Sequence, residues 1–324
     1  MRVIIPVAGV GSRLRPHTYT VPKVLLNVAG KPIIGHILDR LIEDGFTEVT
    51  VVVGYLGDKI KDYILKEYSI KVDFVEQEER LGLGHAIYLS KHTISRDPIL
   101  IVLGDTIFDV DFKGFTQSGS STIGVREVED ARRFGVAETK NGFITRLVEK
   151  PEQPTSNLAV VGLYYIEHPD KLVECLKEMI KKSIKTRNEF QLTDALQMMI
   201  DQGEKMKTHT IDGWYDCGKP ETLLETNRIL LDRLPAPPTM NGVVLQPPVY
   251  ISPKAVVKNS VIGPYAAIAD GARVENSVIR NSIISEDATV ANSMLEDSIV
   301  GTSAIIKGSF KRINIGDSSE LEFY

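Results

Sequence analysis

The sequence predicts an α/β fold with a mostly parallel sheet covered by helices on both faces, followed by a short left-handed parallel β-helix. Strand patterns alternate with helical patterns over the first two-thirds of the chain. An apolar residue then recurs every five or six positions from Ile251 to Ile306. Between these regions lies the proline-rich segment Leu234 to Pro238, which cannot continue a helix. A chain of 324 residues has room for one large and one smaller domain.

The elements of the first region follow from their patterns in order. Short runs of β-branched and aliphatic residues favour buried strands, and apolar residues three or four apart favour helices. Strands are expected at Arg2 to Pro6, Val49 to Val53, Val72 to Val75 and Ile99 to Leu103, and helices at Ile34 to Leu41, Asp58 to Glu67, Gly84 to His92 and Pro220 to Arg233. Open parallel sheets bind ligands beyond the carboxyl ends of their strands, so residues that follow strands are the first candidates for a site.

The C-terminal repeat resembles the hexapeptide repeat of left-handed parallel β-helices. Its apolar positions are Ile251, Val257, Ile262, Ile268, Val274, Ile279, Ile284, Val290, Leu295, Val300 and Ile306. A β-sandwich would show irregular spacing and period-two alternation instead. Each triangular coil takes roughly three such units, so about three coils are expected. We therefore assign 1–234 to the α/β domain, 235–248 to a proline-rich linker and 249–324 to the β-helix.

Composition excludes several classes of protein. The net charge of −5 argues against a general binder of nucleic acid or anionic membranes. Two cysteines, Cys175 and Cys217, cannot form a multi-disulfide framework and fit a reducing compartment. The N-terminus lacks the pattern of a signal peptide, and no apolar run approaches the ~20 residues of a membrane helix. A cytoplasmic location is expected.

The segment directly after the first predicted strand has the composition of a phosphate-binding loop. Small residues at Ala8, Gly9 and Gly11 allow backbone N–H groups to close around a phosphate. Arg13 and Lys23 follow and supply the positive charge that a triphosphate requires.

Other glycine loops fit this segment less well. A Walker-type loop needs Gly-Lys-Ser/Thr, which is absent here. A dinucleotide fingerprint requires a third small residue where Leu14 stands. A tight strand-to-helix turn without any ligand also uses glycine, and the glycines alone do not exclude it.

The longer pattern from Gly9 to Pro32 resembles the signature of sugar-1-phosphate nucleotidylyltransferases. It reads G-V-G-S-R-L-R-P-H-T, then P-K, L-L and G-K-P. The resemblance implies that 1–234 is a Rossmann-like catalytic domain, which transfers a nucleotidyl group to a sugar 1-phosphate, releases pyrophosphate and uses Mg²⁺. Many members have Gly-Gly at the start of the loop. Ala8 stands at the first position here and fits only with a negative φ.

Two aspartates resemble the metal ligands of this family. Asp105 follows the strand that ends at Leu103, and Asp216 lies in the motif W-Y-D-C-G. Hard carboxylate oxygens are suitable ligands for Mg²⁺ on a triphosphate. Asp216 could instead cap the helix that follows it. Asp109 and Asp111 are nearby rivals, for which we favour an exposed loop.

The resemblance also implies a sugar-phosphate site. Glu149 and Lys150 match the E-K-P segment, in which Glu holds sugar hydroxyls and Lys holds the phosphate. Arg187 precedes the segment E-F-Q-L-T-D and resembles an arginine that also reaches this phosphate. Gly135 and Asn157 resemble further sugar-binding positions, although Asn157 is equally typical of a turn.

The base of the nucleotide is assigned by the same resemblance to Gln77 and Gly82. A glutamine amide offers a donor and an acceptor to a pyrimidine edge, and glycine lets the backbone approach the base. The three histidines near these motifs, His17, His36 and His85, are expected to be structural or exposed.

Three segments, T-Y-T-V-P-K from Thr18, Q-L-T-D-A-L from Gln191 and G-W-Y-D-C-G-K-P-E-T-L-L-E-T-N-R from Gly213, look closest to long-form glucose-1-phosphate thymidylyltransferases. This resemblance covers nearly the whole chain and implies glucose 1-phosphate as acceptor. Thymine and uracil share a hydrogen-bonding edge, and one methyl group discriminates by roughly 1 kcal/mol, so dTTP is only slightly favoured over UTP. The alternatives are a UTP–glucose-1-phosphate uridylyltransferase and a catalytically silent regulatory or scaffold homologue. A β-helix that acetylates a sugar is disfavoured because about three coils leave little room for an acyl donor. The exposed coils favour oligomerisation or regulation, and a homo-oligomer is expected.

Overall fold

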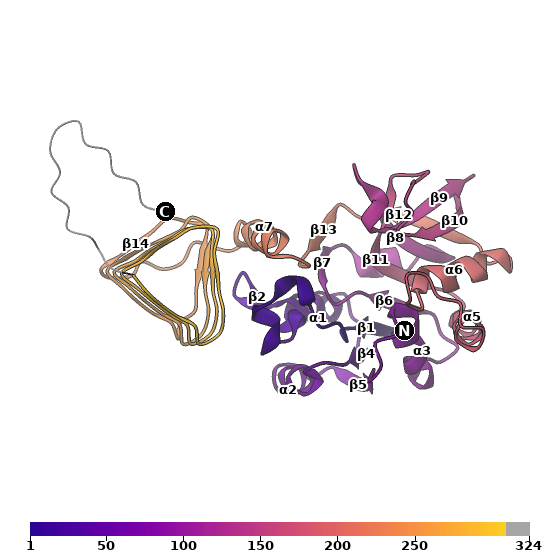
Figure 1. Cartoon of the computed structure of the whole chain (residues 1–324), viewed down its shortest axis with the longest axis horizontal. Helices are drawn as coiled ribbons and strands as arrows, with labels where there is room; N and C mark the ends of the chain where they lie inside the picture. Colours follow the sequence, from indigo (N-terminus) through magenta and orange to yellow (C-terminus); the bar gives the residue numbers. More distant parts are fainter. Residues whose placement is uncertain (309–324) are drawn as a thin grey trace. The chain divides into compact units, whose positions relative to one another are not determined.

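The computed structural model describes residues 1–308, which form two compact units (Figure 1). The first unit comprises Met1–Leu26 and Lys31–Leu223. The second comprises the short segment Asn27–Gly30 together with the chain from residue 224 onward.

The first unit is built on a mixed sheet with a parallel half. Strands β6 (Ile99–Val102), β1 (Arg2–Pro6), β4 (Glu48–Val53) and β5 (Lys71–Glu76) lie side by side in this order, all parallel. Helices α1 (Ile33–Glu43), α2 (Gly57–Glu67) and α3 (Leu83–Leu89) connect or follow them. Successive residues of β1 point to opposite faces, yet Val3, Ile4 and Ile5 are all fully buried, so both faces are covered. The predicted α/β class is confirmed.

An antiparallel half extends the sheet beyond β6. Its central strand is β11 (Leu158–Ile166), which runs antiparallel to β6, β8 (Ser121–Glu127) and β9 (Gly135–Lys140). The outer strands are β10 (Phe143–Glu149), which pairs with β9, and β12 (Met206–Thr210), which pairs with β8. Helices α5 (Pro169–Lys181), α6 (Leu192–Asp201) and α3 share one buried apolar cluster with these strands.

A separate two-stranded ribbon completes this unit. Strands β7 (Thr106–Asp109) and β13 (Gly213–Asp216) pair antiparallel, and the short helix α4 (Phe112–Phe115) follows β7. Helix α7 (Pro220–Leu231) starts shortly after β13. The ribbon therefore places the ends of two distant segments beside each other.

The second unit contains the predicted β-helix. Within residues 224–308, strands β14 to β25 form three parallel sheets of four strands each, and Figure 1 shows the coils stacked with a triangular outline. The strands are β14 (Val243–Leu245), β15 (Val249–Ile251), β16 (Val256–Lys258), β17 (Ser260–Ile262), β18 (Ala266–Ile268), β19 (Arg273–Glu275), β20 (Val278–Ile279), β21 (Ile283–Ile284), β22 (Thr289–Ala291), β23 (Met294–Leu295), β24 (Ile299–Val300) and β25 (Ile305–Lys307). The inward apolar residues Ile262, Ile268 and Val274 are fully buried, as the repeat predicts.

Four strands in each sheet mean that the prediction of about three coils is too low. The difference arises at β14, which lies inside the segment 235–248 that the sequence favours as a linker. Prolines flank this strand on both sides, but its own residues Val243 and Leu245 pack against the apolar core of the coils. Because prolines flank this strand, the sequence favours a linker where the first strand of the coils lies.

The segment Asn27–Gly30 belongs to the β-helix unit through specific contacts. The Ala29 N–H donates to Asn227 Oδ1 at 2.8 Å, and Asn27 Nδ2 donates to Glu286 Oε1 at 2.6 Å. Gly30 has φ +87°, and a methyl group there would lie 2.4 Å from the Tyr250 ring. Only glycine permits this approach. None of the helices in the described chain combines the length and apolar character needed to cross a bilayer.

Candidate active site

The predicted phosphate loop lies at the carboxyl end of β1, beside the end of β6. The Val7 N–H donates to Val52 O at 2.8 Å. Gly11 has φ +62°, and a methyl group there would lie 2.9 Å from Thr18 Cγ2. A methyl group on Gly9 would meet nothing within 4 Å, so this part of the loop faces open space. Ala8 has no positive φ, which is the condition that its methyl group requires.

Lys23 reaches the other side of this edge and pairs with Asp105. The Lys23 Nζ lies 2.8 Å from Asp105 Oδ2, although the two residues are 82 positions apart in sequence. Lys23 is only 8% exposed, whereas the Asp105 side chain is 41% exposed. Burial raises the pKa of Asp105, but the charges of Lys23 and Arg13 outweigh it and hold the pKa below its usual value. The carboxylate is therefore ionised at neutral pH.

Arg13 and Asp216 meet beside Gly218. A methyl group on Gly218 would lie 2.8 Å from Asp216 Oδ1 and 3.0 Å from the nearest Arg13 guanidinium nitrogen. Arg13 is exposed, and its charge also acts on Asp105. One arginine therefore accompanies both candidate metal ligands.

The ribbon of β7 and β13 brings Asp105 and Asp216 to one end. Asp216 is the register partner of Thr106, and the Cys217 N–H donates to Asp105 O at 3.1 Å. The Asp216 oxygens also accept from the Gly218 N–H at 2.9 Å and the Thr222 hydroxyl at 3.2 Å. Since Thr222 lies in the first turn of α7, the same carboxylate also supports the helix start, which is the alternative role.

The donor set of this pair fits Mg²⁺. Within residues 1–308, no cluster of three or more His, Cys, Asp or Glu side chains is arranged to hold a metal by itself. Mg²⁺ on phosphates uses only one or two carboxylates and completes its shell with phosphate and water oxygens. Asp105, directly before β7, and Asp216, the last residue of β13, supply that number.

The rival aspartates lie elsewhere on this ribbon. Asp111 is exposed, accepts the Gly114 N–H at 2.9 Å and caps α4, so it lies at the start of a helix, whereas the sequence favours an exposed loop. Asp109 is exposed and pairs in register with Gly213, at the end of β7 away from Asp105.

A second cluster surrounds Glu149 at the end of β10. Its Oε2 accepts the Thr193 hydroxyl at 2.8 Å, and its Oε1 lies 2.9 Å from Lys150 Nζ. Gly135 is the register partner of Glu149, and a methyl group there would lie 3.3 Å from Glu149 Oε2 and 3.2 Å from the Thr193 hydroxyl. Gly135 therefore leaves space directly above the carboxylate.

Arg187 approaches the same cluster from the loop before α6. Its guanidinium donates to Lys150 O at 2.9 Å. Lys150, Arg187 and Asn188 all have positive φ, at +45°, +55° and +65°. Such backbone conformations are uncommon for non-glycine residues and concentrate at functional sites. Asn157 is exposed at the start of β11, and its carbonyl accepts the Val128 N–H, so its recorded contact is that of a turn.

The predicted base-reading residues form a third part of the site. Gln77 is 6% exposed, and its Nε2 donates to Gly82 O at 3.1 Å and contacts His85 Nδ1 at 3.1 Å. Gly82 has φ +111°, and a methyl group there would lie 2.6 Å from Phe190 O. The Phe190 N–H donates to Leu81 O at 2.7 Å. The segment around Gly82 therefore packs against the loop that carries Arg187 and Phe190.

Three further residues join the clusters and were not identified as site residues from the sequence. Tyr164 is 4% exposed, and burial together with the charges of Glu149 and Asp105 raises its pKa. Asp194 has a raised pKa, mainly through burial, and its Oδ2 is buried without a hydrogen-bond partner among residues 1–308. Thr193 holds Glu149. In the sequence, Tyr164 looks like an ordinary core residue of an apolar strand. Thr193 and Asp194 could be found only through the T-D motif.

Several known proteins are similar to this chain in sequence. The nucleotidyl transferase family model matches residues 2–233. The low-salt glycan biosynthesis nucleotidyltransferase Agl11 of Haloferax volcanii is 35% identical over 242 residues, which are 72% of this chain but only 66% of that protein. A glucose-1-phosphate thymidylyltransferase of Streptomyces griseus is 32% identical over 316 residues, with 88% and 87% coverage.

A solved structure is similar to this chain in fold. A UDP-glucose pyrophosphorylase complexed with UDP-glucose superposes with a TM-score of 0.62 at 28% identity, and the match covers 72% of this chain and 99% of that one. The family match covers well over half of the chain and includes the loop, the ribbon and the Glu149 cluster. The chain therefore belongs to the nucleotidyl transferase family.

Proposed function

We propose that this protein transfers a nucleotidyl group from a pyrimidine nucleoside triphosphate to a sugar 1-phosphate, with glucose 1-phosphate as the acceptor. The carrying observation is that the two clusters lie at the same end of the sheet. Asp105 follows the end of β6, and Glu149 pairs with Gly135 at the start of β9, beside the part of β11 that extends past that end of β6. A cationic phosphate loop and a separate sugar-phosphate cluster therefore face one region of the sheet.

The reaction is a single in-line displacement. An oxygen of the sugar phosphate attacks the α-phosphorus, a new P–O bond forms, and the bond to the β-phosphate oxygen breaks to release pyrophosphate. The nucleophile is already anionic at neutral pH, so no proton transfer and no covalent enzyme intermediate are required. Catalysis then consists of positioning and charge neutralisation.

Lys23 and Arg13 act on the triphosphate. The loop of Ala8, Gly9 and Gly11 presents backbone N–H groups, and Gly9 faces open space where a phosphate fits. Lys23 is held in place by Asp105, and Arg13 lies beside Gly218. Both cations neutralise the charge that develops on the leaving pyrophosphate.

Asp105 and Asp216 would hold the magnesium ion. When bound, Mg²⁺ supplies Lewis-acid neutralisation of phosphate oxygens. Asp105 is shared with Lys23, so the ammonium and a metal compete for the same carboxylate. The lowered pKa of Asp105 keeps it available as an anion.

Glu149, Lys150 and Arg187 position the nucleophile. The Glu149 carboxylate accepts hydroxyls of the sugar above Gly135, while Lys150 and Arg187 bind its phosphate. Asn157 is assigned to the sugar by the resemblance alone.

Thr193→Val is expected to raise the KM for the sugar 1-phosphate by about tenfold, because Glu149 loses the hydroxyl that orients it. The KM for the triphosphate should stay near its wild-type value. Thr155→Val is a matched control, since the Thr155 hydroxyl donates to Glu138 at an exposed position. A Thr193→Val enzyme with an unchanged KM for the sugar would remove Glu149 from this role.

Base selection is assigned to Gln77 and Gly82. We favour dTTP slightly over UTP on the sequence pattern, and the similarity to a thymidylyltransferase and to a UDP-glucose pyrophosphorylase supports a pyrimidine. Pyrophosphate release with four triphosphates and three sugar 1-phosphates tests this. We expect dTTP and UTP with glucose 1-phosphate to exceed every purine combination. A purine triphosphate as the best donor would contradict the base assignment, and no release from any pair would contradict the transfer itself.

The β-helix unit is proposed to mediate a homo-oligomer in the cytoplasm. Its outward residues Val244 and Met294 are 58% and 76% exposed in one face of four parallel strands. Val244→Asp with Met294→Asp is expected to lower the mass measured by light scattering, with the Lys66→Gln variant as a surface control. An unchanged mass would exclude this face from assembly.

A further inference from the structure

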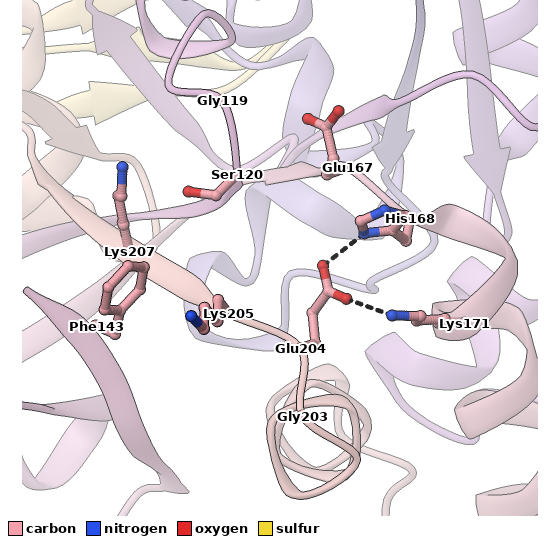
Figure 2. Close-up of a pocket in the computed structure, with 10 residues that line it drawn as sticks. All are labelled: Gly119, Ser120, Phe143, Glu167, His168, Lys171, Gly203, Glu204, Lys205 and Lys207. Carbon is pink, nitrogen blue, oxygen red and sulfur yellow. Dashed lines mark hydrogen bonds and ion pairs between the residues drawn. The ribbon is translucent and has the colours of Figure 1, made fainter.

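A separate cavity of about 410 Å³, drawn with its lining residues in Figure 2, lies at the opposite end of the sheet from the candidate active site. Ile166, the last residue of β11, pairs with Ile99, the first residue of β6. Glu167 and His168 follow directly and line the cavity. The phosphate loop and Asp105 lie beyond the other ends of β1 and β6. The two sites are therefore distinct.

A buried carboxylate organises one side of this cavity. The Glu204 side chain is only 5% exposed, and its oxygens lie 2.8 Å from His168 Nδ1 and 2.9 Å from Lys171 Nζ. The Ser121 hydroxyl donates to it at 3.1 Å. Burial raises the pKa of Glu204, but these partners outweigh burial and hold the pKa below its usual value. The negative charge of Glu204 is thus compensated locally and is not shared with the other lysines of the cavity.

Two more ammonium groups gather on the opposite side. Lys205 Nζ and Lys207 Nζ lie 5.6 Å and 5.8 Å from the centroid of the Phe143 ring, and Figure 2 shows both lysines beside that ring. Among residues 1–308, the structure records no carboxylate within ion-pair distance of either one. Two like charges held at one aromatic ring repel, and an anion between them would relieve this repulsion.

A hydroxyl group adds a donor to the same wall. The Ser120 Oγ is buried and has no hydrogen-bond partner in the described chain, which is unfavourable unless a ligand supplies one. Glu167 also lines the cavity, and its carboxylate accepts the Tyr165 hydroxyl. Two ammonium groups and a hydroxyl match the several acceptor oxygens of a phosphate.

We propose that this cavity binds a small phosphate-bearing anion, with its phosphate held by Lys205, Lys207 and Ser120. The volume exceeds that of a single phosphate and falls in the range of sites for small metabolites, so the ligand carries a second phosphate or a compact organic group. Such a site adds a second binding function to a family member whose proposed reaction occurs at the other end of the sheet.

Titration calorimetry with inorganic pyrophosphate, in the presence of a chelator, tests the proposal on the full chain. The Lys23→Ala background weakens pyrophosphate binding at the candidate active site, and all cavity variants are compared within this background. We expect Lys205→Gln with Lys207→Gln to weaken the remaining binding at least about tenfold, and Ser120→Ala to weaken it less. Lys66→Gln with Lys258→Gln removes two exposed lysines outside the cavity and should change nothing.

Each outcome decides the matter. Binding that is unchanged in the Lys205→Gln and Lys207→Gln variant, or equally weakened in the control, would overturn the proposal. The proposal would also be overturned if sulfate bound as tightly as pyrophosphate, because the cavity would then recognise negative charge alone. Failure of the proposed nucleotidyl transfer would appear instead as no pyrophosphate release in the wild-type enzyme, with binding at this cavity unaffected.

Discussion

Lys23→Ala is expected to lower turnover by about 10²–10³-fold, the usual cost of removing one preorganised electrostatic donor from a site of developing negative charge. Lys23 is 8% exposed and is oriented by Asp105 at 2.8 Å, so no solvent cation reproduces its position. Steady-state release of pyrophosphate measures the loss. Lys182→Ala removes a lysine that pairs with Glu178 at the end of α5 and should leave turnover unchanged.

The folded state should tolerate this change. The Asp105 side chain is 41% exposed and keeps Arg13 nearby, so losing Lys23 leaves no fully buried charge. The lowered pKa of Asp105 stabilises the wild type above the ordinary aspartate pKa, and this contribution disappears as pH falls through the lowered value. Any difference in Tm should therefore shrink in acid. Unfolding at neutral pH, or near-normal turnover, would refute the role of Lys23.

Asp105→Asn is expected to lower turnover by a similar factor and to raise the Mg²⁺ concentration needed for half-maximal activity at least about tenfold. An amide has nearly the same shape but carries no charge for a hard cation. Activity should vanish in chelator and return when Mg²⁺ is added. Asp216→Asn should shift the requirement in the same direction, because both carboxylates lie at one end of the ribbon.

Asp109→Asn provides the control on the same ribbon. Asp109 pairs in register with Gly213, at the end of β7 away from Asp105, and should leave the metal requirement unchanged. Binding of Mn²⁺, followed by its paramagnetic effect on water protons, gives a readout independent of turnover. Equal effects at Asp105 and Asp109 would remove Asp105 from the metal site.

Local motifs explain which parts of the site could be predicted from sequence. Gly11 has a positive φ and lies close to Thr18, and both conditions require glycine at this position. The loop can therefore be recognised from its glycine. Lys23 and Asp105 were each assigned by their own motifs, but no motif shows that they pair. Tyr164 could not be recognised, because a buried tyrosine in an apolar strand has the same local pattern whether or not nearby carboxylates raise its pKa.

The C-terminal unit shows the same limit. The apolar period predicts the coils because every inward position of a β-helix must be buried, as Ile268 and Val274 are. Two features of this unit depend on contacts between residues distant in sequence, so the apolar period does not predict them. Strand β14 is hidden between prolines, and Asn27–Gly30 joins this unit through Asn227 and Glu286.

The most direct test of the central claim is mass spectrometry of the products formed from glucose 1-phosphate with dTTP or UTP. The account predicts a pyrimidine nucleoside diphosphate glucose and pyrophosphate in a one-to-one ratio, both lost together in Lys23→Ala. Pyrophosphate or phosphate released without a nucleotide sugar, or a product that persists in Lys23→Ala, would contradict it.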